Sequence, residues 1–164
     1  CTLFQAERET VLQGPWLADA RLPAEMTIVP WLELDAGLRE ELYGRLSRSN
    51  SVPENLDPRW NETGIAPCSV GMIYEGKIAG WCIAYWLDSN TVCRWRLWVD
   101  PALQRMARAV PLLAETIRRG RIYGISYGVW SVSADNSAML RLLDRRMKGY
   151  LNSAKPEWEV QKAL

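Results

Sequence analysis

The spacing of apolar residues predicts strands through the middle of the chain and helices on either side of it. Three runs rich in β-branched and aromatic residues lie between positions 68 and 99. Such runs, bounded by turn residues, are typical of strands. Glu75-Gly76-Lys77 and Asp88-Ser89-Asn90 separate the runs and predict two tight hairpin turns. We therefore expect three antiparallel strands, at 68–75, 78–87 and 91–99.

Helical spacing is found on both sides of this block. Leu38, Leu42 and Leu46 recur every four residues after Asp35, a residue that favours a helix N-cap. A second helix is expected at 112–119, with Gly120 closing it as the residue after the cap. A third is expected after Asp135 or Asn136 and ends at Gly149, with these residues facing inward: Met139, Leu140, Leu143 and Met147.

The remaining segments complete a mixed sheet. Strands are predicted at 26–34, where Pro30 argues for an edge or a kink, and at 122–133. The 52–67 stretch predicts a loop with one helical turn, and the tail after 150 fits one or two short strands. Residues 1–24 are predicted to be an N-terminal extension or the tail of a preceding domain. Residues 25–164 are expected to form one α/β (α+β) domain, in which a crossover helix follows the antiparallel strands.

Composition narrows the possible partners and setting. The 164 residues carry 20 Lys and Arg against 19 Asp and Glu, so neither nucleic acid nor a membrane is an expected partner. No apolar run approaches the roughly 20 residues that span a bilayer, and no signal peptide is recognisable. The four cysteines form no C-x-x-C pair, which favours a reducing, cytoplasmic setting.

The chain contains no histidine, which restricts its chemistry. A Ser-His-Asp triad, a Cys-His pair and a histidine-based metal site are all excluded. No metal site is predicted. Nine tryptophans are present, and most of those in the sheet block are expected to pack in the core. Others could line a cavity for an apolar or aromatic ligand.

The stretch RLWVDPALQRMARAVP, residues 96–111, begins like a buried strand and continues like a helix. Arg105 and Arg108 lie within its strand-to-helix turn, interleaved with small residues. One interpretation is a solvated first turn of an ordinary helix. The other is an anion site, where backbone N–H groups and the helix dipole meet a phosphate.

Three stretches resemble the GNAT superfamily, the acyl-CoA-dependent N-acetyltransferases. EGKIAGW (75–81) resembles the hairpin between the family's second and third strands. LWVDPALQRMARA (97–109) is similar to its pyrophosphate loop, and VSADNSAMLRLLDRRMKGY (132–150) to its last motif, in which an Asn opens a helix. The matching loop positions are Val99, Pro101, Gln104, Ala107 and Ala109. The resemblance covers roughly residues 26–164.

The resemblance implies a GNAT-like sheet with a splayed wedge between the family's fourth and fifth strands. Acetyl-CoA or another acyl-CoA would bind there, its pantetheine arm pairing with the backbone of 97–99. Asn136 would touch the same arm, and the N–H groups of 105–109 would cradle the pyrophosphate. The implied cofactor-binding residues are Leu97, Trp98, Val99, Gln104, Arg105, Met106, Ala107, Arg108, Ala109 and Asn136.

The resemblance implies an N-acyltransferase in which a small-molecule or peptide amine attacks the thioester directly. A carboxylate acting through water is the expected base, and its identity stays open. The family often has a Tyr seven residues after the Asn as general acid, where this chain has Leu143. Tyr150, Ser131 or Ser133, or water could replace it, so no catalytic residue is assigned.

The missing Tyr motivates two alternatives to a fully active enzyme. One is a catalytically weakened module that binds acyl-CoA as a structural or sensing half of a larger protein. The other takes its acyl group from an acyl carrier protein. A homodimer, or an upstream domain of the same polypeptide, is a possible partner in each case.

Overall fold

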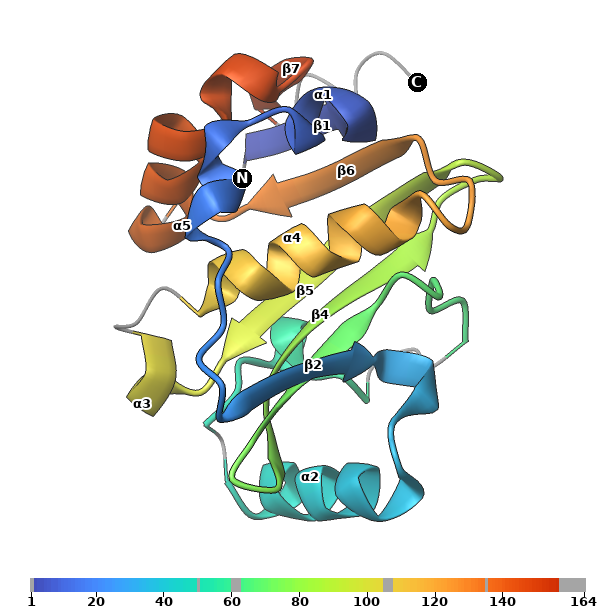
Figure 1. Cartoon of the computed structure of the whole chain (residues 1–164), viewed down its shortest axis with the longest axis vertical. Helices are drawn as coiled ribbons and strands as arrows, with labels where there is room; N and C mark the ends of the chain where they lie inside the picture. Colours follow the sequence, from blue (N-terminus) through green and yellow to red (C-terminus); the bar gives the residue numbers. More distant parts are fainter. Residues whose placement is uncertain (1, 50, 60–62, 105–107, 135, 157–164) are drawn as a thin grey trace.

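A seven-stranded sheet forms the centre of the computed structural model, which describes residues 2–49, 51–59, 63–104, 108–134 and 136–156 (Figure 1). The strands lie across the sheet in the order β2-β3-β4-β5-β6-β1-β7. Their bounds are β1 Thr2–Glu7, β2 Met26–Pro30, β3 Val70–Tyr74, β4 Lys77–Trp86, β5 Thr91–Val99, β6 Tyr127–Val132 and β7 Ser153–Pro156.

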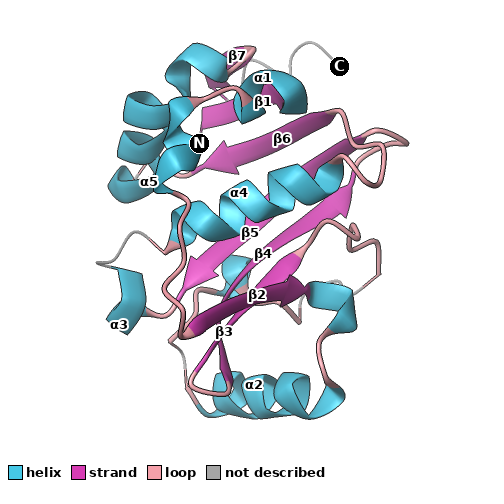
Figure 2. Cartoon of the chain, in the orientation of Figure 1, coloured by secondary structure: helices cyan, strands magenta, loops and turns pink. Residues whose placement is uncertain are grey.

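Helical segments connect and cover these strands (Figure 2). The α-helices are α1 Arg8–Leu12, α2 Ala36–Arg48, α3 Pro101–Gln104, α4 Ala109–Gly120 and α5 Ser137–Leu142. Shorter helical turns are η1 Pro15–Asp19, η2 Trp31–Glu33, η3 Glu54–Leu56, η4 Leu143–Met147 and η5 Lys148–Tyr150.

The helices cover opposite faces of the sheet. Neighbouring side chains of β4 point to alternate faces, and each set packs against a different helix. Cys82 belongs to a core shared with α4, whereas Trp81 and Ile83 belong to a core shared with Leu42 and Leu46 of α2. We call these the α4 face and the α2 face. Figure 1 shows α4 running across the first of them. A ligand that passes between two strands would therefore reach both faces.

Several predicted local features are confirmed. The Asp35 carboxylate caps α2 by accepting hydrogen bonds from the N–H groups of Gly37 (2.8 Å) and Leu38 (3.3 Å). The first hairpin turns at Glu75 and Gly76, with φ of 50° and 73°. β5 begins and ends where the pattern predicted. The predicted fold class, a mainly antiparallel mixed sheet flanked by helices, is confirmed as well.

The first strand was not foreseen as part of the sheet. β1 pairs antiparallel with β6 along all six of its residues and with β7 on its other side. The Arg8 guanidinium then donates a hydrogen bond to the Ile125 carbonyl, just before β6. Residues 2–7 are thus an internal strand of the same sheet. The boundary predicted between residues 24 and 25 stays a prediction.

Several predicted boundaries were wrong. The strand predicted at 26–34 ends at Pro30, and the helical turn η2 follows it at Trp31–Glu33. α4 runs from Ala109 through Gly120, and the left-handed glycine that follows it is Gly124 (φ 70°). The strand predicted from 122 begins only at Tyr127, because hydrogen-bonded turns occupy the residues between. The predicted stop at Gly149 fails because this glycine lacks the left-handed conformation of a helix-ending residue, and η5 continues through it.

Candidate active site

β5 and β6 pair over only part of their length. They run parallel, and the register joins Thr91 to Tyr127, Val92 to Gly128 and Cys93 to Val129. Beyond these pairs the two strands separate. On the other side of β5, the register with β4 shifts between Ile83 and Tyr85, so that β5 contains one more residue than β4 opposite it. A bulge of this kind bends a strand, and the bend coincides with the separation of β5 from β6.

The separated ends border a cavity of about 120 Å³, which we call the wedge. Its walls come from both faces of the sheet: α4 and α5 contribute from the α4 face, and η3 contributes from the α2 face. Among the described residues that line it, none carries a charge. They are Asn55, Leu56, Leu97, Leu113, Trp130, Ser131, Val132, Ser133, Asn136, Met139 and Leu143.

The β5 backbone presents hydrogen-bonding groups to the wedge. The Asp100 N–H donates to the Ala79 carbonyl of β4 (2.8 Å). Because successive residues of a strand direct their N–H and C=O groups to alternate sides, those of Leu97 and Val99 are directed away from β4, towards the wedge. The Gln104 side chain donates to the Val99 carbonyl (2.8 Å). Among the described residues, no hydrogen-bond partner is seen for the N–H of Val99 or for either backbone group of Leu97.

The predicted residues of β5 differ in what their side chains do. Leu97 lines the wedge and is half-buried. The Trp98 ring is buried on the α2 face, where it stacks on Trp81 with ring centroids 4.5 Å apart. Val99 packs in the α4-face core. Val99 can therefore contribute its main-chain N–H to the wedge. The backbone groups of Trp98 are directed towards β4, where Trp98 pairs with Trp81, so this predicted cofactor-binding residue is not brought to the wedge.

The α4 N-terminus lies close to the wedge. Leu113, one helical turn after Ala109, is one of the lining residues. Pro111 occupies the third helical position, where its missing N–H removes no helical hydrogen bond. The Arg108 Nε atom, at the cap of α4, is buried and has no hydrogen-bond partner among the described residues. Arg105, Met106 and Ala107, also predicted to bind the cofactor, lie outside the described residues.

The last motif brings two predicted positions to the same cavity. Asn136 caps α5, its side-chain oxygen accepting a hydrogen bond from the Met139 N–H (3.1 Å), and it lines the wedge. Leu143 is 2% exposed and also lines the wedge. Tyr150, in contrast, packs near Gly14 and the α4-face core. The position of the usual acid thus faces the wedge, and Tyr150 does not line it.

The two fully buried thiols, Cys68 and Cys82, do not supply a nucleophile. Burial raises the pKa of the Cys68 and Cys82 thiols to about 12, which keeps both protonated at neutral pH. In the described part of the chain, no three Cys, Asp or Glu side chains gather as a metal site would require. None of the described helices is long and apolar enough to cross a membrane.

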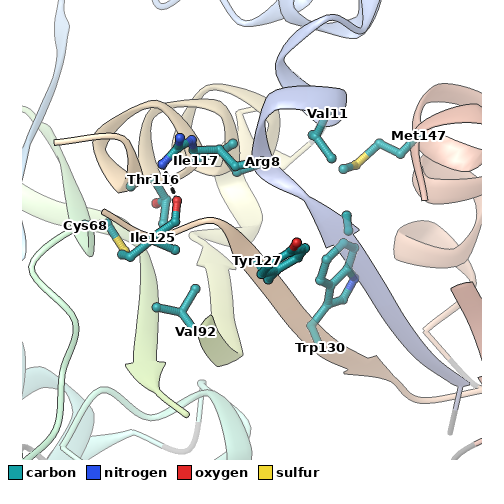
Figure 3. Close-up of a pocket in the computed structure, with 13 residues that line it drawn as sticks. Arg8, Val11, Cys68, Val92, Thr116, Ile117, Ile125, Tyr127, Trp130 and Met147 are labelled. Atoms are coloured by element: carbon teal, nitrogen blue, oxygen red, sulfur yellow. Dashed lines mark hydrogen bonds between the residues drawn. The ribbon is translucent and has the colours of Figure 1, made fainter. Parts of the chain in front are cut away.

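A second cavity lies on the α4 face and contains about 20 Å³, room for about one water molecule (Figure 3). Apolar side chains dominate its lining, including Val11, Val92 and Ile117. Of the residues predicted to bind a cofactor, none lines it. Trp130 borders both cavities. We interpret the smaller cavity as a packing void beside the residues of β5 and β6 that pair with each other.

Sequence reasoning missed the η3 wall of the wedge. The 52–67 stretch was predicted as a loop with one helical turn, and η3 confirms the turn. Nothing in its composition indicated that Asn55 and Leu56 would lie against strands about 40 residues further along the chain. Leu113 and Met139 were predicted only as helix residues, and their place at the wedge depends on how the helices pack.

Comparisons with known proteins agree with this geometry. The family model described as Acetyltransferase (GNAT) family matches residues 31–150. No curated protein matches the chain by sequence. Many solved structures share its fold. One is a GCN5-related N-acetyltransferase from Kribbella flavida, at 12% identity and a TM-score of 0.51 over 79% of this chain and 47% of that one.

Two further neighbours are matched over most of their own length. AAC(6')-Iy, in complex with the bisubstrate analogue CoA-S-monomethyl-acetylneamine, is 16% identical, with a TM-score of 0.52 over 74% of this chain and 89% of that one. Ard1 from Thermoplasma volcanium is 15% identical, with a TM-score of 0.53 over 74% of this chain and 81% of that one. The chain therefore spans about half of the Kribbella protein and most of the other two.

Proposed function

This chain belongs to the GNAT acetyltransferase family, and we propose that it transfers an acyl group from coenzyme A to a primary amine by direct attack. The observation that carries the proposal is the wedge. Two parallel strands separate there, and unpaired backbone groups of one strand face a cavity bordered by a helix N-terminal turn. A sheet that was only structural would gain stability by closing this gap.

The residues present fit an acyl-CoA. The Leu97 carbonyl and the N–H groups of Leu97 and Val99 would pair with the amides of the pantetheine arm, and the Asn136 side chain would contact the same arm. The N-terminal turn of α4 would bind the pyrophosphate, because its free N–H groups and dipole favour an anion. Arg108, whose Nε lacks a partner in the described chain, would add a positive charge there.

The chemistry requires little from side chains. The acyl-CoA supplies a carbonyl that an amine attacks, so that an amide forms as the C–S bond breaks and the thiol leaves. A backbone N–H of β5 would polarise that carbonyl, and apolar walls would exclude water. Among the lining side chains, Ser131, Ser133 and the amides of Asn55 and Asn136 are hydrogen-bond donors that could assist the departing sulfur.

A binding module without turnover is the second candidate, and Leu143 favours it. A leucine at the position that faces the wedge cannot donate a proton, and no described lining residue titrates near neutral pH. Such a module would bind acyl-CoA, or dock an acyl carrier protein, as a sensing or structural unit. An upstream domain or a second copy of the chain would then be its partner.

Calorimetry with acetyl-CoA, followed by thiol-release assays over a panel of amines, amino acids and short peptides, separates the candidates. The transferase should bind acetyl-CoA and release thiol only when an amine is offered. Binding without turnover across the panel would favour the module. Failure of the folded protein to bind either acetyl-CoA or CoA would overturn the transferase and the CoA-binding module, and would leave only the module that docks an acyl carrier protein.

A further inference from the structure

The wall that η3 builds stands on the α2 face, opposite the predicted cofactor entrance. Asn55 and Leu56 are the described wedge-lining residues from this side. Beyond them lies an open hollow of about 500 Å³, whose lining includes Glu54, Asp57 and Arg59. If the cofactor enters beside α4, this hollow next to η3 is where the amine would approach.

Trp81 of β4 makes the first of two hydrogen bonds that attach η3 to the sheet. Its indole N–H donates to the Leu56 carbonyl (3.0 Å), and its side chain is 0% exposed. The ring stacks on Trp98 and packs at a tilt against Trp31. Because these rings fix the indole in position, its N–H fixes the carbonyl of a wall residue.

Arg96 of β5 holds the next carbonyl along the chain. Its guanidinium donates to the Asp57 carbonyl (2.5 Å) and lies 5.6 Å from the centroid of the Tyr85 ring. The side chain is 6% exposed. Arg96 directly precedes Leu97, so one dipeptide of β5 supplies both a wedge-lining side chain and an anchor for the opposite wall.

A buried arginine is a costly way to fill a core. Desolvating a guanidinium is unfavourable unless hydrogen bonds and charges compensate, and an apolar residue is often as stable in such a place. Arg96 lies on the same face as the aromatic side chains of Tyr85 and Trp98, and the Asp57 carboxylate is near enough to interact with its charge. What the guanidinium adds is a directional bond to η3.

We propose that Trp81 and Arg96 are positioning residues for the acceptor amine. By holding the Leu56 and Asp57 carbonyls, they fix η3 as the acceptor-side wall of the wedge. Loosening η3 would impair the placing of the amine while leaving acyl-CoA bound on the other side. The inference rests on the proposed transferase function.

The test compares Arg96→Met, Arg96→Lys and Trp81→Phe with Arg45→Met. Arg45 of α2 is the control, because it too donates to a backbone carbonyl, that of Ile78 (2.6 Å), and its other bond is to Glu41 of its own helix. Arg96→Met should raise the KM of the best amine of the panel about tenfold, since small misplacements of a reactant are expensive. The KM of acetyl-CoA should change less than twofold.

Arg96→Lys should recover part of the loss, and Trp81→Phe should show a smaller rise in the amine KM. Hydrogen exchange followed by mass spectrometry should show faster exchange over 54–59 in Arg96→Met and no change there in Arg45→Met. An unchanged amine KM, an equal rise in both KM values or unchanged exchange over 54–59 would overturn the inference.

The proposed function is tested separately, by the wild type. A wild type that fails to bind acetyl-CoA refutes the transferase whatever the variants do. If it binds acetyl-CoA and turns over no amine, exchange over 54–59 decides whether the two side chains hold η3, and an Arg96→Met pattern like that of Arg45→Met refutes the anchor.

Discussion

The β5–β6 pair has two halves: a closed half, in which the strands pair, and an open half, in which they separate around the wedge. In the closed half, Thr91–Cys93 pairs with Tyr127–Val129, and Val92 is buried against Ala84 and Ile125. In the open half, Leu97 stands across the wedge from Trp130 and Ser131, with no ladder between the strands. The closed half contributes stability, and in the proposed function a ligand would supply the pairing that the open half lacks.

The register shift between β4 and β5 explains how the halves can differ so sharply. One extra residue in β5 bends the strand at the point where β6 stops pairing with it. The sheet remains continuous on the β4 side, where Val99 and Leu97 still pair with Gly80 and Cys82. The wedge is thus a local opening within an otherwise complete sheet. Substitutions in the closed half should mainly change stability, and substitutions in the open half should mainly change ligand binding.

The largest expected effect comes from Ala109→Glu at the mouth of the open half. If the first turn of α4 receives the pyrophosphate, a carboxylate there repels it at close range. The Kd for CoA should rise at least about 100-fold by calorimetry, with folding unchanged by circular dichroism.

Ile122→Glu is the matched control for that experiment. It adds the same charge beyond the other end of α4, at a side chain that is 73% exposed. We expect it to leave CoA affinity unchanged. Unaltered CoA affinity in a folded Ala109→Glu protein would contradict the assignment of α4 as the anion site.

Truncating a side chain should affect stability most in the closed half and acetyl-CoA affinity most in the open half. Val92→Ala removes two buried methyl groups from the closed half and should lower the free energy of unfolding by about 2 kcal/mol, with no change in acetyl-CoA affinity. Leu97→Ala should cost less stability, because Leu97 is only half-buried. It should weaken acetyl-CoA binding about fivefold, since the ligand loses about 1 kcal/mol of apolar contact. Urea titration and calorimetry on both variants measure this, and equal responses would erase the distinction between the halves.

Local patterns predicted much of this fold. The residues at 91–99 alternate as a strand must, and Asp35 and Asn136 cap helices as their short polar side chains favour. The resemblance of 97–109 and of 132–150 to two GNAT motifs pointed to Leu97 and Asn136, and both residues line the wedge. Their role in binding a cofactor stays a prediction.

Long-range contacts could not be predicted in this way. β1 pairs with β6 about 125 residues further along the chain, and no local pattern records such a partner. The bonds that hold η3 span 25 and 39 residues, and both end on backbone carbonyls, which every residue type possesses. The position of the η3 wall therefore depends on Trp81 of β4 and Arg96 of β5. In the sequence, nothing distinguishes these two from other strand residues.

A third prediction concerns the chemistry of the open half. Leu143→Tyr places a phenol at the position that faces the wedge and should raise kcat about tenfold, below the 10²- to 10⁴-fold typical of a well-placed acid. Leu143→Phe adds the same ring without the hydroxyl and should give no rise. Tyr150→Phe should change kcat little, because Tyr150 packs away from the wedge.

These variants also decide where the acid lies. A large fall in kcat for Tyr150→Phe, at unchanged stability, would show that the chain has moved its acid along the last helical turns. Equal rates for Leu143→Tyr and Leu143→Phe would show that a phenol at this position does not protonate the leaving thiolate.

The smallest effect separates the side chain of Asp57 from its carbonyl. Arg59 donates to the Asp57 carboxylate, with Nη2 and Oδ2 2.6 Å apart, and this bond holds the pKa of Asp57 below its usual value of 3.8. A carboxyl whose pKa is lower in the folded state stabilises the fold above its unfolded pKa, and this contribution disappears as the pH falls through the folded pKa. Asp57→Asn should therefore cost about 0.5 kcal/mol at pH 7, as expected for a partly exposed ion pair, and the difference from wild type should shrink as the pH falls below 3.8.

Urea titrations of both proteins at pH 7, 5, 4 and 3 measure this difference, and a gap that widened in acid would contradict it. The backbone carbonyl that accepts from Arg96 is kept in Asp57→Asn, so acetyl-CoA affinity and the amine KM should both match wild type. If Asp57→Asn raised the amine KM as much as Arg96→Met, the carboxylate rather than the anchored carbonyl would place the acceptor, and the open half would depend on charge on the α2 face as well as on the shape of its wall.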